Sequence, residues 1–118
     1  MIHDHTPPRR PKRREPIHNS GVILIPLAGD LGMVRLNAAD HARLRAQGFS
    51  DQWCLHRDRD GRAYVRVANP ERRGGVLTVA RLILDTPAGR IIRYRNGDRT
   101  DLRRVNLWVK ERAIPKVR

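Results

Sequence analysis

The chain has one cysteine, no long apolar run and few aromatic residues, and each shortage argues against a class of protein. A single cysteine, Cys54, excludes an internal disulfide and a zinc site built on several cysteines. No apolar run approaches the length of a transmembrane helix, and the first residues lack the apolar core of a secretory signal. We therefore expect a cytoplasmic protein with no membrane partner. Aromatic residues make up 4% of the chain, which disfavours an RNA-binding mode built on stacked bases.

Acidic residues are also few. The chain has 25 Lys plus Arg against 12 Asp plus Glu, a net charge of +13, which favours a polyanionic partner and a nucleoid-associated location. The lysines are only Lys12, Lys110 and Lys116, so the basic side is almost all arginine. The planar guanidinium matches phosphate oxygens and the guanine edge. A GC-rich coding sequence would also raise the arginine content, so the ratio alone decides nothing.

Residues 1–19 differ in composition from the rest. This segment is rich in proline and has no apolar cluster, which predicts a disordered basic arm. It could gain order on a DNA backbone or in a minor groove, although a plain solubilising tail is the alternative. Its candidate DNA contacts are Arg9, Arg10, Lys12, Arg13 and Arg14. Residues 20–118 are expected to form a single domain.

Short β-prone runs that alternate with short helical segments predict an α+β domain of antiparallel hairpins and short helices. A helix is expected over residues 38–47, with Asn37 as its N-cap and Gly48 at its end. A shorter helix should follow Thr78 and end before Pro87. The residues expected to face inward are Ala38, Ala42, Leu44 and Phe49 for the first helix, and Val79, Leu82 and Ile83 for the second.

Two hairpins are expected. Residues 53–57 and 63–68 flank a turn that contains Asp60-Gly61, a strong tight-turn signal. Alternation along the second strand should place Tyr64, Arg66 and Ala68 on one face, and Ala63, Val65 and Val67 on the other. We expect Cys54 to be a buried structural thiol. The second hairpin should join residues 91–95 and 106–110. Tyr94 and Trp108 are expected in the core, with base-stacking platforms as the less favoured alternative.

Residues 26–109 resemble the small HNH homing-type endonucleases of phages and mobile elements. These enzymes couple a module similar to the plant Apetala DNA-binding domain to a ββα-metal core. The resemblance rests on the order and spacing of four stretches, which are IPLAGDLGMVRLNAADHARLRAQGFSDQWCLHR, GRAYVRV, VARLIL and IIRYRNGDRTDLRRVNLWV, residues 25–57, 61–67, 79–84 and 91–109. It implies an Apetala-like sheet and helix in residues 20–76 and a degenerate HNH part in residues 77–118.

The resemblance implies that the nuclease chemistry has been lost. Ala80 stands where the family has a histidine, and Arg93-Tyr94 stand where it has the Asp-His pair of metal ligand and general base. The family's last ligand falls on Pro115 or Lys116. Arg93 would place a fixed cation at the metal position, and tyrosine is a poor base at neutral pH. We therefore expect no catalytic residue, no metal and no cofactor. Gly97, Asp101, Arg103, Asn106 and Leu107 are retained.

The retained residues have expected structural roles that need no metal. Asn106 should tie the loop by bonds from its side chain to the backbone, and Asp101 should cap a turn. The hairpin of residues 53–68 corresponds to the sheet by which the Apetala-type module reads DNA, and Arg66 at mid-strand is its best candidate. Arg59 and Arg62 could equally be plain turn residues. The candidate DNA contacts of the domain are Arg57, Arg59, Arg62, Arg66, Arg93, Arg95, Arg103 and Arg104.

These features predict a sequence-dependent DNA-binding protein, a transcriptional regulator of bacterial or phage origin derived from an HNH nuclease. Its expected partners are double-stranded DNA and RNA polymerase or another regulator, and the default oligomeric state is a monomer. Two alternatives stay open at this point. One is a basic protein that binds RNA or the ribosome; the other is a phage-type inhibitor that acts on a protein partner.

Overall fold

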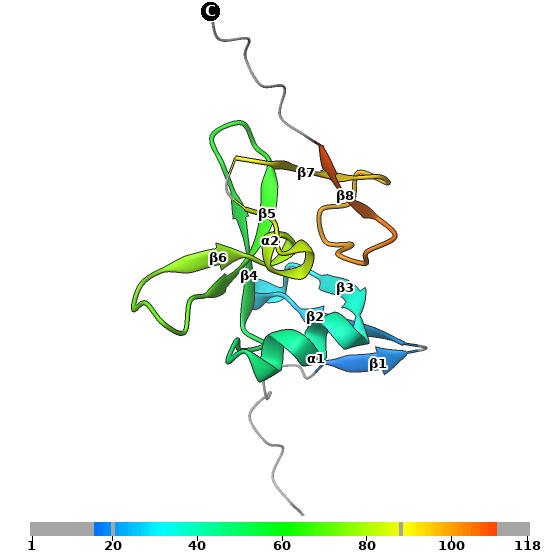
Figure 1. Cartoon of the computed structure of the whole chain (residues 1–118), viewed down its shortest axis with the longest axis vertical. Coiled ribbons are helices and arrows are strands. Elements are labelled where there is room, and N and C mark those ends of the chain that lie inside the picture. Colours follow the sequence, from blue (N-terminus) through cyan, green and yellow to red (C-terminus); the bar gives the residue numbers. More distant parts are fainter. Residues whose placement is uncertain (1–15, 20, 88, 111–118) are drawn as a thin grey trace, which may run out of the picture.

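The computed structural model describes residues 16–19, 21–87 and 89–110. Over this part of the chain it contains strands and two α-helices, and all of its sheets are antiparallel, so the α+β prediction is confirmed. The strands form three separate sheets, β1-β2-β3, β4-β5-β6 and β7-β8 (Figure 1). No helix within the described ranges is long and apolar enough to cross a membrane.

The first sheet joins β1 (Ile17–Asn19), β2 (Val22–Pro26) and β3 (Met33–Asn37). Alternate residues of β2 and β3 are fully buried, as period-two geometry requires for a sheet with one covered face. A short 3-10 turn, η1 (Ala28–Asp30), lies between them. Strand β1 pairs along β2, so the folded part begins before residue 20. The composition predicts a start at residue 20 itself.

Helix α1 (Ala38–Ala46) follows β3 directly, and Gly48, with φ near +95°, leads the chain out of it. Leu44 and Phe49 are buried, as predicted. The prediction for Ala42 is wrong: its side chain is exposed, because the inward side of the helix passes through Asp40 and Leu44 instead. Asn37 has the extended backbone of an N-cap, but its side chain makes no capping bond.

The second sheet contains β4 (Trp53–Arg57), β5 (Ala63–Ala68) and β6 (Val76–Thr78). The predicted hairpin is confirmed, with Val65 and Val67 buried on its inner face. The prediction for Cys54 is wrong, since this thiol is exposed. Cys54 pairs with Arg66 across the sheet and so lies on the outer face, whereas the neighbouring Trp53 points into the core.

Helix α2 (Val79–Leu84) packs against β5 and β6. Val79, Ala80 and Ile83 are buried, and Leu82, predicted to face inward, is half-buried and packs against the core. Thr78 precedes the helix as predicted but makes no capping bond through its side chain.

The third sheet pairs β7 (Ile91–Tyr94) with β8 (Leu107–Lys110). Leu107 is buried and Tyr94 is half-buried against the core, in line with the prediction for Tyr94. The prediction that Trp108 is a core residue is wrong, since 40% of its surface is exposed. Trp108 is the cross-strand partner of Arg93, and alternation along β8 turns Leu107 inward and Trp108 outward.

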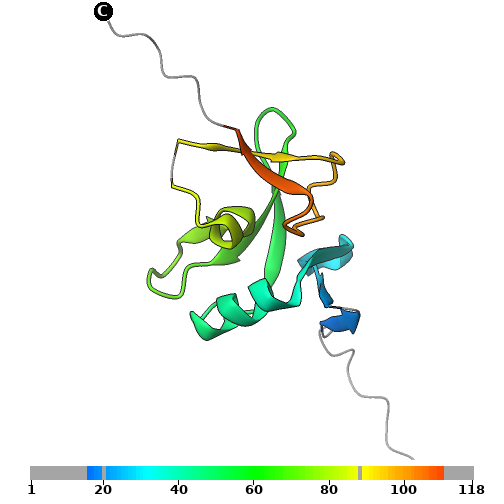
Figure 2. The same ribbon diagram turned by 45° about the vertical axis from the view of Figure 1, so that its right-hand side comes forward.

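One hydrophobic core unites the three sheets and both helices. Isolated bridges join Leu27 to Trp53 and Arg35 to Asp101. They connect the first sheet to strand β4 of the second sheet and to the loop between β7 and β8. The two segments distinguished in the sequence, 20–76 and 77–118, therefore share a single core over their described residues. In Figures 1 and 2, α1 lies at one end of the molecule, β7 and β8 lie at the other end, and α2 lies between them.

Candidate nucleic-acid interface

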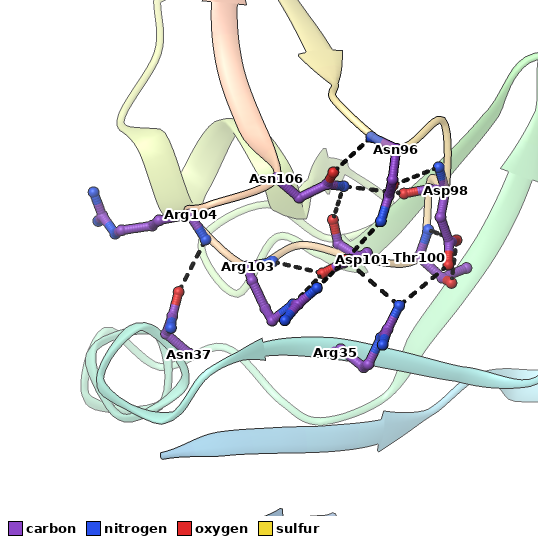
Figure 3. A network of polar contacts seen from close by, with 9 residues as sticks. All are labelled: Arg35, Asn37, Asn96, Asp98, Thr100, Asp101, Arg103, Arg104 and Asn106. Carbon is purple, nitrogen blue, oxygen red and sulfur yellow. Dashed lines mark hydrogen bonds and ion pairs between the residues drawn. The ribbon is translucent and has the colours of Figure 1, made fainter. Parts of the chain in front are cut away.

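The loop between β7 and β8 is held by the carboxylate of Asp101, which is completely buried (Figure 3). Its oxygens accept hydrogen bonds from Nε and Nη2 of Arg103, at 2.8 and 2.7 Å, and from Nδ2 of Asn96 at 2.9 Å. The bonds from Arg103 hold the pKa of Asp101 below its usual value, although desolvation acts in the opposite direction. The backbone N–H of Arg103 also donates to Asp101, so the predicted turn-capping role is confirmed.

Asn106 ties the two ends of the same loop, as predicted. Its Nδ2 donates to the carbonyl of Asp101 at 2.8 Å, and its Oδ1 accepts from the backbone N–H of Asn96 at 2.9 Å. The loop is fastened to β3 by backbone bonds: Arg35 N–H donates to the Thr100 carbonyl, and Leu102 N–H donates to the Arg35 carbonyl. These bonds fix the position of the β7–β8 hairpin relative to the first sheet.

Arg104 joins three parts of the fold. Its guanidinium contacts both carboxylate oxygens of Asp40 in α1, at 2.9 to 3.1 Å, and donates to the carbonyl of Ile83 near the end of α2 at 2.8 Å. Its backbone N–H donates to Oδ1 of Asn37. Arg103 and Arg104 were candidate phosphate contacts, but the structure gives both guanidinium groups intramolecular carboxylate partners. Both guanidinium groups are therefore ion-paired within the fold, while both side chains stay partly exposed.

A groove of about 460 Å³ lies between the second and third sheets. Four of its lining residues are arginines and none is acidic; the arginines are Arg62, Arg81, Arg93 and Arg99. Within the described part of the chain, the guanidinium of Arg93 makes no hydrogen bond or ion pair, and its side chain is exposed. A concave surface lined by four arginines attracts anions. The carboxylate of Asp58 lies at its edge, where it interacts with Arg62 and Tyr64.

Arg99, in the loop between β7 and β8, lines the groove and contacts two tyrosine rings. Its guanidinium carbon lies 4.9 Å from the ring centre of Tyr94 and 5.2 Å from that of Tyr64, and Nη1 donates to the carbonyl of Ala63. Burial raises the pKa of Tyr94 above its ordinary value, although the nearby Arg99 acts to lower it. The phenol therefore stays protonated at neutral pH.

The groove continues onto the outer face of the second sheet. Thr78 lines the groove and is the cross-strand partner of Arg66; Tyr64, also in the lining, lies two residues before Arg66 on β5. Arg66 is half-buried and makes no hydrogen bond or ion pair among the described residues. Cys54 flanks it on β4. Arg66, the residue predicted to contact bases, therefore lies at the centre of a sheet face that the arginine groove borders.

The remaining candidate DNA contacts of the β4–β5 hairpin lie in or beside the turn of residues 58–61. Oδ1 of Asp58 accepts from the backbone N–H groups of Asp60 and Arg62, both at 2.9 Å. Although desolvation acts to raise it, these bonds keep the pKa of Asp58 below its usual value. Arg57 donates to the carbonyl of Gly61, and Arg59 is exposed at the turn. Of these residues only Arg62 lines the groove.

The positions at which the resemblance places nuclease residues do not form one open site. Arg93 and Tyr94 line the groove, but Ala80 is 1% exposed in the core and Asn106 belongs to the loop network. A histidine at position 80 would have to fit into a packed core. Across the described ranges, no group of three His, Cys, Asp or Glu side chains is close enough together to hold a metal ion.

Sequence reasoning missed Arg81 and Arg99. Arg81 is held by bonds to the carbonyls of Pro87 and Arg90, at 3.2 and 2.7 Å, and no local pattern marks either arginine as part of a groove. The candidates Arg9, Arg10, Lys12, Arg13 and Arg14 lie outside the described residues, as do Pro115 and Lys116. Comparisons with protein-family models, curated proteins and solved structures found no match.

Proposed function

We propose that this protein binds double-stranded DNA with sequence preference and acts as a regulator without cutting the DNA. The observation that carries the proposal is the acid-free arginine groove next to the open sheet face that presents Arg66. In this proposal the groove and the hairpin make different contacts. Arg62 and Arg93 grip backbone phosphates, and Arg66 reaches a base edge, where a bidentate contact to guanine discriminates between bases.

The net charge supports the same partner. At +13 the chain is attracted to a polyanion, and arginines that are not paired inside the fold release counterions from DNA when they contact phosphates. Arg103 and Arg104 have no part in this contact surface because Asp101 and Asp40 already pair with them. Recruitment of RNA polymerase or another regulator belongs to the proposal as a consequence of promoter occupancy.

The groove contact is tested by measuring the affinity for a duplex of mixed sequence as a function of salt. The double variant Arg62→Gln/Arg93→Gln should bind more weakly, and its slope of log K against log salt should be less steep by about 2, because two phosphate contacts are lost. The matched control is Arg72→Gln/Arg73→Gln, which removes two exposed arginines of the β5–β6 loop. Equal slopes in the two double variants would refute the groove as the phosphate contact.

The absence of cleavage is tested separately. Supercoiled plasmid incubated with the protein and Mg²⁺ or Mn²⁺ should stay supercoiled, since the groove presents arginines and a neutral phenol in place of metal ligands and a base. Nicked plasmid that accumulates in proportion to the protein concentration, and that does not form when a chelator is present, would show an active nuclease. That result would overturn this part of the proposal.

A further inference from the structure

The β7–β8 hairpin has a second face that overlaps the groove only at Ile91 and Arg93. Its outward residues, here called the outer β7–β8 face, are Ile91, Arg93, Arg95, Trp108 and Lys110. Trp108 is 40% exposed, and the guanidinium carbon of Arg95 lies 5.9 Å from its ring centre. One cation, Arg95, therefore lies beside the exposed indole. Arg93 and Lys110 belong to the same face, and no acidic side chain belongs to this set. The opposite face of the hairpin carries Leu107 into the core.

We propose that the outer β7–β8 face binds an unpaired nucleotide of a single-stranded segment, with the base stacked on Trp108 and the adjoining phosphates on Arg93, Arg95 and Lys110. Stacking on an aromatic side chain flanked by basic residues is how sequence-tolerant single-strand contacts are made. Every base has a π-face, so the site needs no base-specific donor. The inference rests on the proposed function, and it adds an unpaired, single-stranded region to the double-stranded DNA proposed as the partner.

The position of Arg93 connects the two surfaces. Arg93 lines the groove and is also the cross-strand partner of Trp108, so a strand whose phosphate lies in the groove is next to the indole. An acidic peptide would satisfy the same cations. The nucleotide is the better match because one flat aromatic ring beside arginine offers stacking area, and because the face continues into a groove lined by four arginines.

The test is the affinity of the full chain for a labelled 12-nucleotide oligothymidylate and for a mixed-sequence duplex of equal length, followed by fluorescence anisotropy. Trp108→Ala should weaken single-strand binding by about 5- to 100-fold and change duplex binding by less than about 2-fold. Trp108→Phe, which keeps an aromatic ring, should restore most of the single-strand affinity. Val105→Ala is the control, since Val105 is 71% exposed and lies outside the face.

Three outcomes overturn the inference. They are unchanged single-strand affinity in Trp108→Ala, an equal loss on duplex and single strand, and binding of polyglutamate that is as tight as that of the oligonucleotide and equally sensitive to Trp108. The proposed function fails in a different way. If the wild type ignores duplex but binds oligothymidylate through Trp108, regulation of duplex DNA is wrong and the single-strand site stands.

Discussion

Four of the described arginines form two contrasting pairs according to what their guanidinium groups contact. Arg103 and Arg104 pair with buried carboxylates, whereas Arg66 and Arg93 have no polar partner among the described residues. Sequence alone could not separate the two pairs, because Arg104 and Asp40 are 64 positions apart and meet only in the folded chain. The roles of Asp101 and Asn106 could be anticipated, since their bonds lie within one short loop.

Replacing Asp101 by asparagine should destabilise the protein by about 3 kcal/mol, because it removes the charge that Arg103 pairs with in a buried setting. Urea unfolding followed by circular dichroism measures the change. Asp60→Asn is the control: Asp60 is exposed in the hairpin turn, and we expect a change within about 0.5 kcal/mol. A similar small change for Asp101→Asn would contradict the assigned role.

The same carboxylate predicts an acid dependence. Bonds from Arg103 hold the folded-state pKa of Asp101 below the usual value of about 3.9, so its stabilising contribution is complete above about pH 5 and is lost as the pH falls through that lowered pKa. Melting temperatures between pH 7 and pH 2 should therefore decline less in Asp101→Asn than in the wild type. Parallel declines would show that Asp101 is not the group responsible.

The strands and helices were predicted well where periodicity and turn chemistry agree. The Asp60-Gly61 turn and the alternation of Val65 and Val67 predicted the β4–β5 hairpin and its inner face. The predictions for Cys54 and Trp108 failed for a shared reason. Both residues are apolar and lie in strands, but each is the cross-strand partner of an outward arginine, and pairing register is not visible in a single strand.

Docking of the β7–β8 hairpin depends on Leu102, which is 0% exposed and follows the bridge from Asp101 to Arg35. Leu102→Ala should cost about 2–5 kcal/mol because it leaves a cavity where the loop meets the core. Val105→Ala, three residues away and exposed, should cost less than about 0.5 kcal/mol. Denaturant midpoints compare the two, and equal midpoints would mean that the loop does not contribute to the common core.

The molecule as a unit combines one small core with a large excess of positive charge. The core draws on every sheet and both helices, so the sheet face that presents Arg66 and the arginine groove are held in a fixed relation. Composition predicted the polyanionic partner. It could not predict the groove, whose lining comes from the β4–β5 turn, β5, β6, α2, β7 and the loop after β7. These segments come together only through the shared core.

The most direct test of DNA reading by this protein is selection of bound duplexes from a random-sequence pool at near-physiological salt, followed by sequencing. The wild type should enrich a short motif with a guanine at one position, and Arg66→Gln should relax the preference at that position by about 1–3 kcal/mol while Arg73→Gln keeps the motif intact. A bound pool without a motif, or an unchanged motif in Arg66→Gln, would contradict sequence-dependent reading by the β4–β5 hairpin.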